Sequence, residues 1–201
     1  MFRMISLCMM LCCCNGLALA EKVENRWAAS YALEANGHYE QAAALMVPEM
    51  SSGEASEFAL LRYGWLNYLQ GNYNDAIRAY GRALKRNQRS VDARLGIALP
   101  LLAQQRWREA RKYLLQVLDQ SPYDYTAHIR LMICEEGLRQ WKQLQVHAQN
   151  IAAHYPTDTT VLIYLARAYA WQGVTEKAKS AYRRVLIRNT LNIEATRFLA
   201  K

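Results

Sequence analysis

Apolar residues recur along the chain at the three- and four-residue spacing that places side chains on one face of an α-helix. Two such runs are Ala76, Ile77, Tyr80, Ala83 and Leu84, and then Leu114, Val117 and Leu118. This spacing predicts helices, and its recurrence predicts an all-α chain.

The helical pattern repeats every 34 residues. A bulky residue marks the repeat four times, at Tyr39, Tyr73, Trp107 and Trp141, and Thr175 takes the fifth place. Three residues after each of these come Ala42, Ala76, Ala110, Leu144 and Ala178, and two residues before them come Gly37, Gly71, Gln105, Arg139 and Gly173. A glycine at this second column would end one helix and turn the chain into the next. A fixed period of this length predicts stacked pairs of helices.

A third column predicts where helices begin. Ser56, Ser90, Asp124, Asp158 and Asn192 are spaced 34 residues apart. Their side-chain oxygens can accept a hydrogen bond from the open N–H groups of a first helical turn. The column therefore predicts helix starts at Glu57, Val91, Tyr125, Thr159 and Ile193. Pro122 and Pro156 lie just upstream of two of these starts, where a preceding helix must have ended.

The best unit carries Gly64, Gly71, Tyr73, Ala76, Tyr80 and Ala83, and this set resembles the tetratricopeptide repeat. The resemblance covers the units 23–56, 57–90, 91–124, 125–158 and 159–192, with a capping helix over 193–201. It implies a right-handed α-solenoid in which the small residues at 76, 110 and 178 let helices approach closely. Tyr73, Trp107 and Trp141 are then expected to fill the gaps between pairs.

Two prolines depart from the pattern. Pro48 falls inside an expected helix, so that helix is predicted to stop early and leave a loop from Glu49 to Gly53. Pro100 falls inside another, where its ring would clash with the carbonyl of residue 96. Residue 96 is Gly, which is expected to ease a kink.

The resemblance also implies a binding surface, because the first helix of each tetratricopeptide pair lines the concave side on which partners dock. The candidate partner-binding residues are Trp27, Tyr31, Phe58, Arg62, Trp65, Tyr68, Ile129, Arg130, Ile133, Tyr164, Arg167 and Trp171. Such a lining suits a partner segment that buries apolar anchors and offers a carboxylate or carbonyl to arginine. The alternative, which the sequence leaves open, is that these side chains pack against adjacent helices or fill a dimer interface.

The segment 1–20 differs from the rest and predicts an export signal. Arg3 precedes an apolar run from Met4 to Cys14, and Ala18-Leu19-Ala20 offers a cleavage site. A lipoprotein signal and an uncleaved anchor remain alternatives. Cleavage would leave Cys134 as the one cysteine, which excludes an internal disulfide. The predicted location is the periplasm.

The net charge of the chain indicates which classes of partner it is suited to bind. Without Arg3 the chain carries 24 Lys and Arg against 17 Asp and Glu, a net charge of +7. This balance suits an acidic protein or an anionic polysaccharide, whereas basic clusters interleaved with aromatics, as nucleic-acid binding needs, are absent. A membrane contact is expected only through partners or an uncleaved leader.

No catalytic constellation is recognisable. His38, His128, His147 and His154 lack metal-ligand spacing, although His147 and His154 can share a helical face. Glu135 and Glu136 are adjacent and point in different directions on a helix. Phosphate-binding loops and haem motifs are also absent. The sequence therefore predicts a protein-binding scaffold of the bacterial envelope that is not an enzyme and needs no cofactor or metal. The alternative is an accessory subunit of exopolysaccharide synthesis or export.

Overall fold

The computed structural model describes residues 25–51 and 55–200. The predicted leader lies outside this range, as does part of the loop predicted after Pro48. The chain divides into two compact units, residues 1–96 and 97–201, and each is described by itself.

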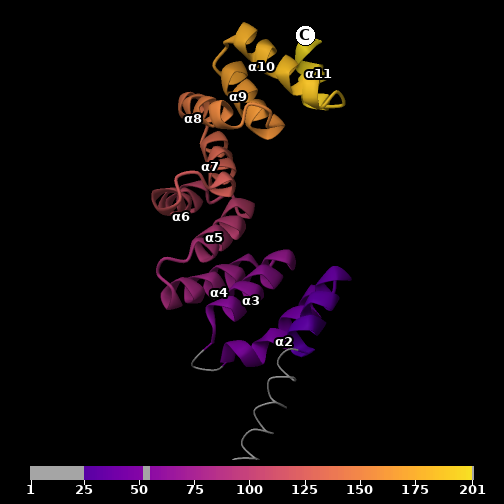
Figure 1. The fold of residues 1–201 in the computed structure, drawn as a ribbon, viewed down its shortest axis with the longest axis vertical. Helices are drawn as coiled ribbons and strands as arrows, with labels where there is room; N and C mark the ends of the chain where they lie inside the picture. The colour runs from indigo at the N-terminus through magenta and orange to yellow at the C-terminus, as the bar shows by residue number, and fades with distance from the viewer. Residues whose placement is uncertain (1–24, 52–54, 201) are drawn as a thin grey trace, which may run out of the picture. The chain divides into compact units, whose positions relative to one another are not determined.

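The described residues are helical and contain no strand (Figure 1). In the first unit, residues 25–35 are helical and precede α2 (Tyr39–Ser51), α3 (Glu57–Leu69), α4 (Tyr73–Arg86) and the start of α5 (Val91–Ala103). The second unit continues from α5 with α6 (Trp107–Gln120), α7 (Tyr125–Gly137), α8 (Trp141–His154), α9 (Thr159–Trp171), α10 (Thr175–Arg188) and α11 (Ile193–Leu199). Consecutive helices pack as pairs, α3 with α4, α6 with α7 and α9 with α10. The fold class is the predicted all-α solenoid, whereas the repeat bounds stay a prediction.

The predicted helix starts are confirmed, because α3, α5, α7, α9 and α11 begin at the five residues named from the sequence. Each of the five preceding side chains caps its helix by accepting a hydrogen bond from the backbone N–H three residues on. The donor–acceptor distances are 3.1 Å for Ser56, 3.0 Å for Ser90, 2.7 Å for Asp124, 2.9 Å for Asp158 and 2.8 Å for Asn192. Local chemistry therefore sets the register of both units.

The five residues of the turn column share one backbone conformation, which confirms that the column marks turns. Gly37, Gly71 and Gly173 have φ of 78°, 80° and 74°. Gln105 and Arg139 adopt the same left-handed region, at 57° and 55°. A side chain is disfavoured there, so the fold imposes the turn even where the sequence lacks glycine.

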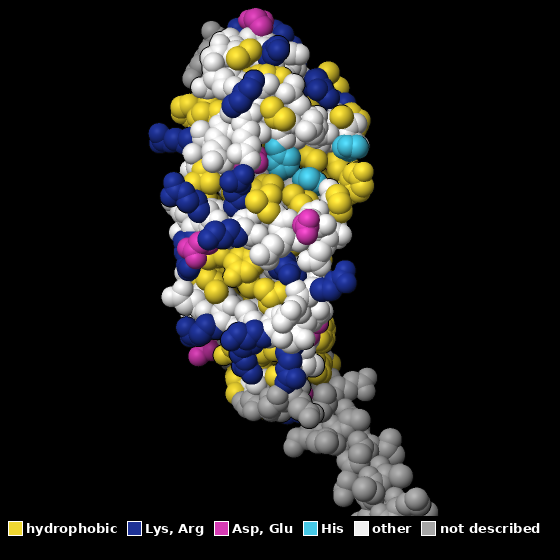
Figure 2. Space-filling view, turned by 90° about the vertical axis from the view of Figure 1, so that its left-hand side faces the viewer, with side chains coloured by type: hydrophobic (Ala, Val, Ile, Leu, Met, Phe, Trp, Pro, Cys, Tyr) yellow, Lys and Arg dark blue, Asp and Glu magenta, His cyan; other side chains and the backbone are white. Residues whose placement is uncertain are grey.

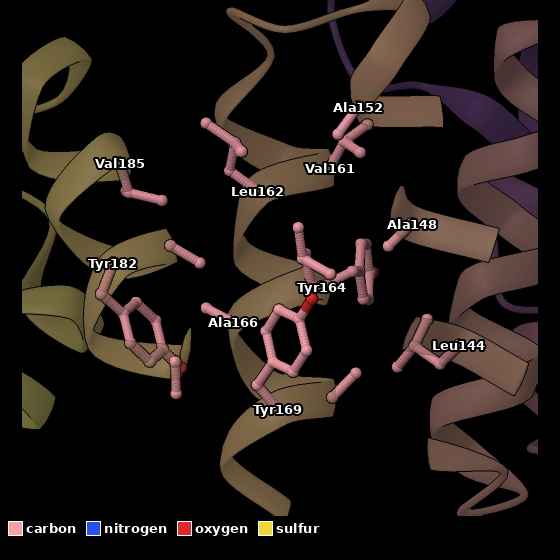
Figure 3. Close-up of a cluster of buried hydrophobic side chains, with 14 of the residues drawn as sticks. Leu144, Ala148, Ala152, Val161, Leu162, Tyr164, Ala166, Tyr169, Tyr182 and Val185 are labelled. Carbon is pink, nitrogen blue, oxygen red and sulfur yellow. The ribbon is translucent and has the colours of Figure 1, made fainter. Parts of the chain in front are cut away.

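Alanine and aromatic side chains dominate the core of the second unit. Figure 3 shows Leu144, Ala148 and Ala152 of α8 facing α9, and Tyr182 and Val185 of α10 facing α9 from its other side. Small residues on one helix receive large residues of the next, as close packing requires.

Large aromatic rings pack against glycines of neighbouring helices. In the first unit, the ring of Tyr80 packs against Gly64 and Gly96, and a Cβ at Gly64 would lie 2.9 Å from it. In the second, Trp107 covers Gly137, where a Cβ would lie 2.5 Å from the indole. Gly96 thus makes room for Tyr80, a role that the sequence did not suggest. Tyr73, Trp107 and Trp141 themselves are only partly buried.

The prediction for Pro48 is wrong, because α2 continues through it to Ser51. Contacts beyond the proline hold the last turn. Arg26 pairs with Glu49 at 2.6 Å, and Met50 is buried in a cluster with Leu60 and Ala83. These contacts outweigh the one backbone hydrogen bond that a proline removes. Pro100 likewise lies within a continuous α5.

Candidate partner-binding surface

In the first unit, the predicted residues meet as matched pairs between helix 25–35 and α3. Trp27 stacks on Phe58 with ring centroids 4.8 Å apart. One turn further, the guanidinium carbon of Arg62 lies 3.9 Å from the centre of the Tyr31 ring. The last pair joins Trp65, whose indole Nε1 donates to the Glu34 carboxylate at 2.6 Å. Residues four and three positions apart share one face of each helix, so the pairs form one continuous row.

The side chain of Arg62 is buried within this row and is not exposed beside the aromatic rings. The residue is 6% exposed. Its Nε and Nη2 donate to Ser30 Oγ at 3.3 and 3.1 Å, and Nη1 pairs with the Glu34 carboxylate. Each of its three nitrogens thus already makes a bond within the chain, and contact between Arg62 and a partner carboxylate stays a prediction.

The aromatic members of the row remain accessible. Tyr31 is 47% exposed and Phe58 is 57% exposed. Trp27 and Trp65 are partly buried, and Trp65 stacks on Tyr68 at 5.6 Å. We call Trp27, Tyr31, Phe58, Trp65 and Tyr68 the aromatic ladder. Large apolar side chains exposed side by side are unusual on a monomer and mark interaction sites.

In the second unit, the predicted residues are used differently. Ile129 and Ile133 of α7 pack against the core that contains Tyr164. Arg130 is partly buried. Trp171 is the exception, at 68% exposed, and it stacks face to face on Trp141 at 5.2 Å. Only one of the six predicted residues here offers a large open surface.

Arg167 ties three helices of the second unit together. Its Nε and Nη2 donate to the two oxygens of Glu194 at 2.8 and 2.6 Å, and Nη1 reaches Glu136 at 3.2 Å. Tyr182 donates to Glu194 at 2.7 Å. Burial alone would raise the pKa of Glu194, but these hydrogen bonds from Arg167 and Tyr182 leave it lowered. Arg167, like Arg62, thus forms ion pairs within the chain, and its predicted contact with a partner stays a prediction.

Sequence reasoning missed Ser30 and Glu34, the two polar residues that organise the ladder. A signal was present, because Glu34 precedes Trp65 by 31 positions, the same interval that separates Trp27 from Phe58. The repeat period alone, 34 residues, does not reveal which side chains of neighbouring helices meet.

Among the described residues, Cys134 is a free cysteine, and it is buried. Burial, with a smaller contribution from Glu135, raises the pKa of the Cys134 thiol to about 12, which keeps this sulfur protonated and unreactive at neutral pH. Within residues 25–51 and 55–200, no helix is long and apolar enough to cross a membrane.

Comparison with known proteins agrees with this architecture. Residues 59–125 and 160–189 each match a family model described as tetratricopeptide repeat. No curated protein sequence matches the chain significantly. The chain belongs to the tetratricopeptide repeat family.

Solved structures of low sequence identity share the fold. MamA from residue 41 to its end, from Desulfovibrio magneticus RS-1, has a TM-score of 0.77 at 17% identity, over 86% of this chain and 97% of that chain. YrrB, described as a TPR protein with an unusual peptide-binding site, has a TM-score of 0.72 at 14% identity, over 86% and 89%. TTC0263 from Thermus thermophilus, a thermophilic TPR protein, has a TM-score of 0.63 at 16% sequence identity, over 89% of this chain and 97% of that chain. Family and fold together support a protein-interaction scaffold, and such repeats are generally not catalytic.

Proposed function

We propose that the protein is an exported scaffold of the bacterial cell envelope that binds a segment of a partner protein on the aromatic ladder. The observation that carries this proposal is the row of stacked rings from Trp27 to Tyr68, in which Tyr31 and Phe58 are about half exposed and the others are partly buried. Aromatic side chains that sit in fixed positions before binding lose little conformational freedom on contact, and they dominate the energetics of protein interfaces.

The contacts of the ladder define the chemistry of the partner. Because Arg62 is buried and bonded to Ser30 and Glu34, the ladder offers ring faces to a partner more than it offers this guanidinium. It therefore suits a segment that contributes aliphatic or aromatic side chains. That YrrB is described as having a peptide-binding site supports a peptide ligand for this chain as well.

Photo-crosslinking tests the proposal directly. A crosslinking amino acid replaces Phe58 on the ladder, and separately the exposed Lys85 of α4 as a matched control. We expect one defined protein to be captured from position 58 and not from position 85. Equal capture from both positions, or capture from neither, contradicts a partner site on the ladder.

Export is tested separately, because it rests on the segment 1–20 alone. Fusing this segment to a reporter enzyme that is active only outside the cytoplasm is expected to give activity. Exchanging its apolar run for polar residues is expected to abolish the activity. An active reporter after that exchange argues against the export signal.

A second candidate function is an accessory role in exopolysaccharide synthesis or export, and it is favoured by the net charge, which is +8 for the full chain and +7 without Arg3. Contact with an anionic glycan is electrostatic and weakens steeply with salt, whereas apolar docking on the ladder does not. Binding of an anionic polysaccharide that disappears at moderate salt and survives Phe58→Ala favours this alternative.

A further inference from the structure

Three side chains of the second unit form a row of hydrogen bonds between α7 and α8. Nδ1 of His147 lies 2.9 Å from Oε2 of Glu135, and Nε2 of His147 lies 2.9 Å from Nδ1 of His128. Nε2 of His128 lies 2.9 Å from the carbonyl oxygen of Pro122. His147 therefore contacts His128. His154, which lies on the same helix as His147, packs instead on Tyr123, with ring centroids 5.9 Å apart.

The two outer partners fix where the hydrogens are. A carbonyl oxygen only accepts hydrogen bonds, so Nε2 of His128 carries a hydrogen. A carboxylate also only accepts, so Nδ1 of His147 carries one too. Each neutral ring has then used its single hydrogen. When both rings are neutral, the two inner nitrogens are left as acceptors that face each other at 2.9 Å, an arrangement that either a proton or a metal ion between them would satisfy.

Hydrogen bonds orient both imidazole rings in the way that metal-binding histidines are oriented. A ligating imidazole almost always donates its far N–H to a carboxylate or a backbone carbonyl, which orients the ring and strengthens the ligand. Glu135, which is 1% exposed, does this for His147, and Pro122 does it for His128. The two far nitrogens are thus occupied by different groups, and the two near nitrogens converge.

An ion can reach the pair from outside. His128, Glu135 and His147 line a cavity of about 680 Å³ together with Leu118, Leu131 and Val146. Figure 2 shows histidine side chains lying close together on the surface, with hydrophobic side chains around them. The cavity leaves room for water ligands beside the two imidazoles.

We propose that His128 and His147 bind one divalent transition-metal ion between Nδ1 of the first ring and Nε2 of the second. Zinc is the ion of choice for a test, because imidazole nitrogen suits it and it forms bonds of about 2.0–2.1 Å. Bonds of that length at a tetrahedral angle place the nitrogens about 3.4 Å apart. The present separation of the two nitrogens, 2.9 Å, is about 0.5 Å shorter than this, so the rings must move apart and turn toward the ion.

The site is expected to be one of modest affinity. Within the described ranges, no group of three or more His, Cys, Asp or Glu side chains is arranged to hold a metal ion. Two protein nitrogens therefore bind the ion, and water completes its coordination. Lys142 also lines the cavity, and its positive charge opposes that of the ion.

Isothermal titration of the untagged, chelator-treated chain with zinc chloride tests the proposal. We expect one site in the wild type, loss of that site in His128→Ala and in His147→Ala, and unchanged binding in the control His154→Ala. Glu135→Gln is expected to weaken binding about 10–100-fold, because it loosens the bond that orients His147. Lys142→Met is expected to strengthen binding, because it removes the opposing charge.

A measurement on the wild type keeps the test decisive if a variant fails to fold. Zinc is expected to shift the ring nitrogen NMR signals of His128 and His147 and to leave those of His38 and His154 in place. Zinc binding that persists in both alanine variants, or rings that do not respond at millimolar zinc, overturns the proposal. In the latter case a proton alone bridges the two rings.

Discussion

The two units share a repeat yet use corresponding residues in different ways. In the first, the facing residues of helix 25–35 and α3 leave Tyr31 and Phe58 about half exposed around a buried arginine. In the second, Ile129 and Ile133 pack into the core, and Arg167 joins Glu136 and Glu194 near the surface. The repeat fixes the backbone and the helix register. It leaves open which faces become core and which stay free, because this depends on individual side chains.

Arg62→Ala is expected to give the largest loss of stability. It leaves Glu34 and Ser30 without the donor that they share. Removing one partner of a fully buried ion pair costs about 3–5 kcal/mol, and because 22% of the Glu34 side chain is exposed, we expect a loss of about 2–3 kcal/mol. Arg167→Ala is the matched change in the second unit. Because the side chain of Arg167 is 33% exposed, we expect a smaller loss, about 1–2 kcal/mol. Urea unfolding measures both, and equal losses would contradict the contrast between a buried and a surface network.

Phe58→Ala is expected to weaken partner binding about 30-fold, which corresponds to the roughly 2 kcal/mol typical of a central interface residue. Trp171→Ala is the control, since this ring is also exposed but lies in the second unit. Affinity for the captured partner measures both variants, with helical content checked by circular dichroism. If Trp171→Ala has the larger effect, the binding surface belongs to the second unit.

Gly96→Ala is expected to destabilise the first unit by about 1–3 kcal/mol, because the new Cβ would run into the ring of Tyr80. Gly81→Ala is the matched control on α4, where a Cβ meets nothing within 4 Å. There alanine is expected to stabilise the helix by up to about 1 kcal/mol. Thermal unfolding of the two variants should therefore shift in opposite directions, and a shared direction would refute the packing role of Gly96.

Arg139→Gly is expected to stabilise the second unit by about 1 kcal/mol, because it relieves a left-handed backbone at a residue with a side chain. Gln105→Gly should act in the same sense. Gly71→Ala, at the equivalent turn of the first unit, should destabilise by a similar amount. Denaturant midpoints compare the three variants. No change in any of them would mean that the turns are not under strain.

The smallest expected effect is on pH dependence. The pKa of Glu194 is lowered in the folded chain because the hydrogen bonds from Arg167 and Tyr182 outweigh burial. A lowered carboxyl pKa contributes stability that is present above the pKa of the unfolded chain, about 4.3. That stability is lost as the pH falls through the folded value. Unfolding followed from pH 6 downward should show this loss, and Arg167→Met should reduce it. An equally steep loss in the variant would assign it to other carboxyl groups.

Features set by local chemistry could be predicted from the sequence. The caps Ser56 to Asn192 and the turn column depend on one or two residues each, and the structure places them where the spacing indicated. Pro48 shows the limit, since Arg26 and Met50 hold a helix that local rules would end. The binding surface was predicted only in outline. Arg62 and Arg167 carry the right chemistry, but their partners Ser30, Glu34 and Glu194 lie 27 to 32 positions away, beyond what helical periodicity reveals.

The five helix caps bear on how the chain folds. Each one fixes the start of a helix through a bond to a residue three positions away, and the bonds that join neighbouring helices span 12 to 33 residues. A chain with such short-range contacts closes only small loops at each step, which favours fast folding. Any helical pair can act as the nucleus, and structure then spreads to its neighbours along the chain.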